Sequence, residues 1–243
     1  SGTYRLLNLR TPACLLDQPG DLIPLDLQIS EGRIVADAGA DAPAVNMAGA
    51  MVLPCFVDMH THLDKGHIWP RSPNPDGTFM GALNAVGADR TARWSAGDVR
   101  ARMSFSLRSA YAHGTRAIRT HLDSLAPQDA ISFPVFTELR AEWAGRIDLQ
   151  AACLVPIDIV EPGGPFARTA EIVAQSGGVL GCVTYPVPDL RRRLRAFFDH
   201  AARRGLQADF HVDETGDPAV ATLRCIAETV LETGFDAPVT VGH

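Results

Sequence analysis

Two histidines separated by one residue are the first group in this chain whose type and spacing could do chemistry. His60 and His62 lie within residues 58–65, directly after the apolar run at 51–57. In a β-strand, side chains two residues apart point to the same side, so both imidazoles would face one point. Neutral imidazole is the commonest metal-binding side chain. Taken alone the pair is a weak signal, because strand ends often carry polar residues for no functional reason.

Polar residues at the ends of later predicted strands strengthen the metal hypothesis. His211 follows an apolar run, Glu214 comes three residues after it, and His243 ends the next predicted strand. If the strands are parallel neighbours, these side chains meet His60 and His62 at one end of the sheet. A single histidine at a strand end is usually structural, but four at such positions rarely arise by chance. The sequence therefore predicts a site for one divalent metal ion with a carboxylate beside it.

The segments that must position these residues alternate between strand and helix after residue 52. The predicted strands are 55–60, 115–120, 148–155, 179–183, 208–212 and 239–243. The predicted helices are 95–113, 133–143, 166–175, 189–204 and 219–232. This alternation predicts a parallel sheet covered by helices. Reactive groups at the carboxyl ends of parallel strands are typical of a barrel, and no glycine-rich nucleotide-binding motif follows any of these strands.

The predicted fold is α/β: a (β/α)₈ TIM-like barrel, of which residues 53–243 would cover about the first six strands. Residues 1–52 read as a small β-sandwich-like domain, because short apolar stretches there are broken by turn residues such as Glu31 and Gly32. A whole barrel needs about 250 residues by itself. We therefore expect this chain to be the front part of a longer protein with roughly two further βα units.

Composition narrows the classes of partner and location. The net charge is −6 and the basic run at 191–193 stands alone, which argues against a nucleic-acid partner. No apolar run nears the length of a membrane span, so no membrane association is expected. The five cysteines are odd in number and scattered, which fits reduced thiols in a cytoplasmic protein. The sequence leaves open whether the chain forms a homo-oligomer.

Short motifs along most of the chain share one family pattern. They are the Gly-Arg-Ile turn at 32–34, the entry into the first barrel strand at 51–64, Arg-Thr-His-Leu-Asp at 119–123, Ile-Asp-Leu-Gln at 147–150, His-Val-Asp-Glu at 211–214 and Gly-His at 242–243. Together they resemble the amidohydrolase superfamily, and within it the cytosine deaminase family, whose members hold a single metal ion. The combination is specific, although each motif alone is not.

The resemblance implies roles for the strand-end residues. His60, His62 and His211 would bind one Zn²⁺ or Fe²⁺, and the family's fourth ligand, an aspartate that ends strand eight, would lie beyond this chain. The metal would lower the pKa of a bound water and supply hydroxide. Glu214 would act as the general acid/base that protonates a ring nitrogen and later the leaving amine. His243 would orient the attacking water and stabilise charge in the tetrahedral intermediate.

The chain departs from the cytosine deaminase pattern where the substrate would bind. The third strand of that family ends in Phe-Pro-Gln, and the glutamine reads the pyrimidine edge; here the aligned residue is Pro156, which has no side-chain donor or acceptor. Cytosine itself is therefore disfavoured as the substrate. Tyr185 stands where the family often has a histidine on strand four. Lys65 is a candidate contact for an oxo group, or a solvent-facing lysine, and His121 and Asp123 either line the pocket or form a strand-end pair.

These observations predict a metal-dependent hydrolase of non-peptide C–N bonds in a small N-heterocycle. It would deaminate a pyrimidine- or triazine-like ring, or remove an alkylamine from it. A cyclic amidase of the hydantoinase type is the alternative enzyme, but such enzymes normally carry a strand-four lysine that bridges two metals, and residues 179–183 contain none. A metal-binding relative without activity is the remaining class. Glu214 argues against it, because a purely structural metal site needs no general acid.

Overall fold

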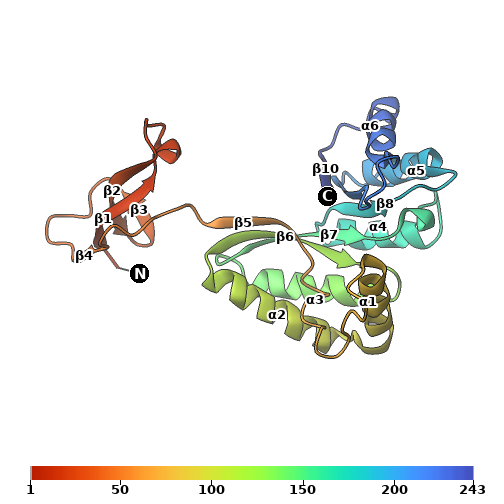
Figure 1. The fold of residues 1–243 in the computed structure, drawn as a ribbon, viewed down its shortest axis with the longest axis horizontal. Helices are drawn as coiled ribbons and strands as arrows, with labels where there is room; N and C mark the ends of the chain where they lie inside the picture. The colour runs from red at the N-terminus through yellow and green to blue at the C-terminus, as the bar shows by residue number, and fades with distance from the viewer. Residues whose placement is uncertain (1, 243) are drawn as a thin grey trace. The chain divides into compact units, whose positions relative to one another are not determined.

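The computed structural model describes residues 2–242, and its contacts divide the chain into two compact units, Ser1–Cys55 and Phe56–His243. The first unit holds a four-stranded sheet in the order β3-β2-β1-β4 (Figure 1). Its strands are β1 (Tyr4–Pro12), β2 (Leu22–Ser30), β3 (Arg33–Val35) and β4 (Ala44–Asn46), with the short 3₁₀ helix η1 (Ala13–Leu16) after β1.

The predicted turn at Glu31 and Gly32 joins β2 to its antiparallel partner β3, and both turn residues have positive φ. The described part of Ser1–Cys55 contains one sheet, in which β3 and β4 are three residues long each. The sandwich-like arrangement expected from the sequence stays a prediction.

The second unit is built on parallel strands that follow one another in chain order (Figure 1). They are β5 (Phe56–Thr61), β6 (Thr115–Asp123), β7 (Asp148–Leu154), β8 (Leu180–Thr184), β9 (Ala208–Val212) and β10 (Val239–Gly242). Strands β5, β6 and β7 form one hydrogen-bonded group, and β8, β9 and β10 form the other. Isolated parallel bridges from Ala152 to Val179 and from Pro156 to Val183 join the two groups. The predicted α/β partial barrel is therefore confirmed.

Helices connect these strands. They are α1 (Phe79–Arg93), α2 (Ala96–Ala112), α3 (Asp129–Glu142), α4 (Pro165–Gln175), α5 (Leu190–Ala202) and α6 (Thr222–Thr233), with the 3₁₀ helix η2 (Ile157–Ile159) after β7. Ser95 caps α2 by accepting a hydrogen bond from the Asp98 amide, as its sequence indicated. Among the helices of residues 2–242, none has both the length and the apolar character needed to cross a bilayer.

Helix α1 was not predicted from the sequence. Its stretch contains Gly81 and Gly87, which have low helix propensity, and its apolar residues form no clear stripe. The helix begins because Thr78 accepts a hydrogen bond from the Gly81 amide. It matters for the site because it supplies Arg90.

Aromatic side chains fill much of the space between the strands and the outer helices. Phe166 of α4, Phe197 and Phe198 of α5, and Phe210 of β9 are all at most 1% exposed. The ring centroids of Phe197 and Phe210 are 4.6 Å apart. Each such side chain contributes about 1.5–3 kcal/mol by leaving water, so this cluster holds β9 firmly against α5.

The strands curl so that residues from distant strands meet on the inner side. Arg119 of β6 donates to Asp209 of β9 and to Thr240 of β10, in both cases at 2.9 Å. At the end of β10, a Cβ at Gly242 would lie 3.0 Å from Nδ1 of His60, on β5. The inner side of this arc is therefore a shared space lined by β5, β6, β9 and β10.

Gly181 provides a test of how closely the strands pack. A Cβ at this position in β8 would overlap the carbonyl oxygen of Cys153 and come within 2.9 Å of that of Asp209. We expect Gly181→Ala to destabilise the fold by about 1–3 kcal/mol, because backbone atoms on both neighbouring strands would have to move. Thermal or urea unfolding measures the change. Gly163→Ala is the matched control, since a Cβ there meets nothing within 4 Å. Equal stability of the two variants would contradict this account.

Candidate metal centre

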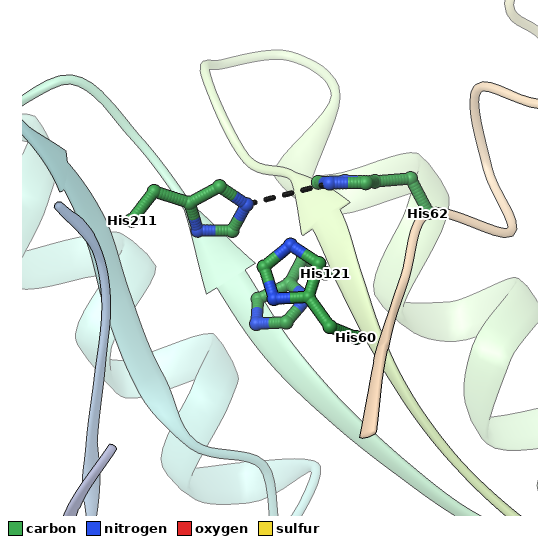
Figure 2. A group of neighbouring side chains, drawn as sticks. All are labelled: His60, His62, His121 and His211. Atoms are coloured by element: carbon green, nitrogen blue, oxygen red, sulfur yellow. Dashed lines mark hydrogen bonds between the residues drawn. The ribbon is translucent and has the colours of Figure 1, made fainter. Parts of the chain in front are cut away.

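Four histidine side chains meet on the inner side of the strand arc (Figure 2). His60 lies on β5, His62 just after it, His121 on β6 and His211 on β9. One ring nitrogen from each lies within 4.8 Å of the others. His121 and His211 are buried, and His60 and His62 are partly buried. Three elements far apart in the sequence thus place four nitrogen donors in one small volume.

The turn after β5 is held against β6, and this fixes the position of His62. The Leu63 amide donates to Oγ1 of Thr120 at 2.9 Å, and the Asp123 amide donates to Oδ2 of Asp64 at 2.8 Å. Asp64 is fully buried. Burial, followed by the charge of Asp123, raises the pKa of Asp64 to about 7. The hydrogen bond to Oδ2 ties the turn to β6.

The spacing of the ring nitrogens fits a tetrahedral metal ion. Nε2 of His62 and Nε2 of His211 are 3.3 Å apart (Figure 2). Two nitrogens bound to one tetrahedral zinc at about 2.0–2.1 Å lie about 3.3–3.4 Å apart. Nδ1 of His121 is buried and has no hydrogen-bond partner among residues 2–242. The donors therefore have the spacing, and one of them the unmet bonding capacity, that a metal site requires.

The electrostatics favour the neutral imidazole that binds metals. Burial, followed by the positive charge of Lys65 and the neighbouring histidines, lowers the pKa of His62 to about 2. The ring is therefore neutral at any pH at which the protein would work. A neutral ring keeps a lone pair available, so no proton has to be displaced before a metal binds.

Lys65, in the turn after β5, and Asp123, at the end of β6, form an ion pair. Both were candidate pocket residues in the sequence. Nζ of Lys65 lies 3.0 Å from Oδ1 of Asp123, and Nη1 of Arg90 lies 2.7 Å from Oδ2. The Asp123 side chain is only 8% exposed. Lys65 is thus anchored rather than simply solvent-facing. Arg90 was missed from the sequence because the helix that carries it was not predicted.

His121 was predicted to line the pocket, and the structure places it within the histidine group. Its Nε2 is 2.9 Å from Oδ1 of Asp209. Sequence reasoning did not single out Asp209. The spacing could have indicated it, because Asp209 lies two residues before His211 on β9 and therefore faces the same side of the sheet.

The other predicted site residues follow the carboxyl ends of successive strands. Pro156 comes after β7 and is partly buried, and Tyr185 comes after β8. Burial, followed by the charge of Asp158, raises the pKa of Tyr185 to about 12, so its hydroxyl stays protonated. Glu214 lies in the loop after β9 and is exposed, outside the histidine group. His243 lies outside the described residues.

Comparison with known sequences finds deaminases and related hydrolases, while no protein-family model matches the chain. The chain is 52% identical over 227 residues to a pterin deaminase of Rhizobium rhizogenes, a match that covers 91% of this chain and 52% of that protein. It is 23% identical over 217 residues to an N-isopropylammelide isopropyl amidohydrolase of Pseudomonas sp., with 82% of this chain and 51% of that protein covered. The chain thus spans about half the length of these curated relatives.

A solved structure shares the same strand arrangement. The 5-methylcytosine deaminase of Klebsiella pneumoniae, crystallised with 5-fluorocytosine, superposes with a TM-score of 0.75 at 26% identity, and the match covers 98% of this chain and 58% of that one. The strand-end histidine motifs, the partial barrel and these relatives agree. The chain is therefore similar to deaminase-type members of the amidohydrolase superfamily.

Proposed function

We propose that this chain carries the metal-binding part of a hydrolase that cleaves a non-peptide C–N bond in a small N-heterocycle. The observation that carries the proposal is the group of four histidines on the inner side of the strand arc. The names of the relatives support it, since they are deaminases of pterin and 5-methylcytosine and an amidohydrolase of N-isopropylammelide. The reaction releases ammonia or an alkylamine and leaves the ring closed.

One divalent metal ion, Zn²⁺ or Fe²⁺, is held by His60, His62 and His211. When bound, it lowers the pKa of a water molecule toward neutrality and so supplies hydroxide. Strand β8 contains no lysine, which favours one metal over a bridged pair. The same absence disfavours the cyclic-amidase alternative.

Glu214 moves the protons of the reaction. It takes a proton from the attacking water and gives it to a ring nitrogen. It then takes the remaining proton of the added hydroxyl and gives it to the leaving amine as the C–N bond breaks. Its exposed place after β9 lets a substrate entering from that end of the strands reach the carboxylate. His243 orients the water and stabilises the charge that develops on the oxygen of the tetrahedral intermediate.

The substrate is held at the same end of the strands. His121, Lys65, Pro156 and Tyr185 lie on or just after four different strand ends, and we place the ring at that end of the strands. Pro156 offers no side-chain hydrogen bond, so cytosine is disfavoured. A pterin carries an amino-substituted pyrimidine within a fused pair of rings, and the 52% identity to a pterin deaminase makes it the first substrate to test.

We further propose that the partner is this small molecule alone, without nucleic acid or membrane, and that the protein works in the cytoplasm. The net charge of −6 supports the first statement, because phosphates would be repelled. The scattered cysteines support the second. Whether the chain forms a homo-oligomer is left open.

Removing a metal-binding histidine tests the site. We expect His62→Ala and His211→Ala to weaken Zn²⁺ binding by at least about tenfold, because each removes a donor nitrogen. Competition with a coloured chelator measures the affinity, and metal analysis after dialysis measures the content. His113→Ala is the control, since that ring is exposed and contacts the carbonyl of Ser109 on its own helix. Parent-like binding by both site variants would refute the assignment.

Ammonia release tests the activity. The metal-loaded protein is offered pterin, 5-methylcytosine, cytosine, isoguanine and ammelide, and ammonia and ring opening are followed separately. We expect ammonia without ring opening, and a loss of about 10²–10⁴-fold in rate in Glu214→Gln with metal content unchanged.

Glu138→Gln is the control for that variant, because Glu138 is an exposed glutamate paired with Arg100 on the outer helices. If Glu214→Gln turned over as fast as the parent, the proton-transfer role would be wrong. Ring opening in place of ammonia release would favour the cyclic amidase.

A further inference from the structure

A buried carboxylate links strands β6 and β9 beneath the histidine group. Asp209 is 2% exposed, and its two oxygens have different partners. Oδ1 is 2.9 Å from Nε2 of His121, and Oδ2 accepts from Nη1 of Arg119 at 2.9 Å. Arg119 is held in turn by Thr240 at 2.9 Å and by Gln150 at 2.8 Å. The carboxylate therefore has little freedom to turn.

This link determines which nitrogen of His121 carries its proton. Oδ2 of Asp209 already accepts from the Arg119 guanidinium, with 2.9 Å between the two atoms of this ion pair. An ionised carboxylate can only accept hydrogen bonds. Nε2 of His121, which faces Oδ1, is therefore the donor, and Nδ1 is the nitrogen that is left to bind a further group.

The His121 ring lies among the rings of the other three histidines. Nδ1 of His121 is buried and has no hydrogen-bond partner within the described residues. The ring centroid of His121 is 4.2 Å from that of His60, 4.7 Å from that of His211 and 5.5 Å from that of His62. A buried acceptor without a donor is destabilising, and a cation bound at this nitrogen would remove that cost.

We propose that His121 is a further nitrogen ligand of the metal ion, through Nδ1, and that Asp209 is the residue that positions it. The proposal rests on the proposed metal site and extends it, because the family resemblance assigns only His60, His62 and His211 from this chain. Strand β9 then supplies the ligand His211. Two residues earlier it also supplies Asp209, whose carboxylate orients the ligand His121. Carboxylates that hold the second nitrogen of a ligating histidine fix its tautomer and strengthen it as a donor.

Asp209→Asn tests the positioning role with little change in shape. The amide can accept from Arg119 through its oxygen, but it presents its NH₂ group to His121, so the imidazole proton must move to Nδ1. That nitrogen can then no longer bind a metal. We expect Zn²⁺ affinity to fall about 10–100-fold and the visible absorption of the Co²⁺-substituted protein to change.

Two further variants separate this role from loss of charge or of fold. His121→Phe keeps a ring but has no donor nitrogen, and we expect a comparable loss of affinity. In the double variant, Asp209→Asn should cause no additional loss, because Asp209 acts through His121. Asp89→Asn is the matched control: Asp89 is also buried, and it is held by Arg71 and Trp94 away from the histidines. Circular dichroism shows whether each variant folds.

The outcomes distinguish this inference from the proposed function. If the parent chain binds Zn²⁺ and both His121→Phe and Asp209→Asn bind it equally well, this inference is overturned and the three-histidine site stands. Additive losses in the double variant would overturn the positioning role of Asp209. If the parent chain binds no metal, the inference and the metal site of the proposed function both fail.

Discussion

The structure of the second unit depends on holding four imidazoles in one small, mostly buried space. Protonated rings would repel one another there, and burial penalises their charge, which is why the pKa of His62 falls to about 2. Neutral rings can share the space only if their backbones are fixed independently. The strand arc does this, since His60, His121 and His211 come from three strands and the turn after β5 fixes His62. The helices outside the arc hold those strands in place.

Close approach of backbones is the second requirement, and glycine meets it at two positions. Gly181 leaves no room for a Cβ between the carbonyl oxygens of Cys153 and Asp209. Gly242 leaves room for the His60 ring at the end of β10. Larger residues at either position would push strands apart and move the histidines by more than a metal site tolerates. The positions of the donor nitrogens therefore depend on the same close packing of strands that curves the sheet.

The sequence predicted the strands and the strand-end histidines because both depend on short-range pattern: apolar runs, and pairs two residues apart. It did not predict α1, because the glycines and the weak apolar stripe of this segment are not typical of a helix. The helix begins at the cap that Thr78 provides. Because Arg90 lies on this helix, the sequence did not indicate its role either. The link from His121 to Asp209 joins residues 88 positions apart and exists only because the strands curl. No local pattern encodes that curvature, although the spacing of Asp209 and His211 placed both on one face.

Strand β6 shows how the interior is ordered. Arg119, His121 and Asp123 alternate with outward-facing residues, so successive members stand about 6.6 Å apart along the strand. Arg119 is matched by the charge of Asp209, and Asp123 by those of Lys65 and Arg90. The layer between them holds the imidazoles. Charges on either side are thus already paired, and a divalent cation in the middle layer would find lone pairs rather than competing positive groups. The same alternation that builds the sheet therefore builds the site.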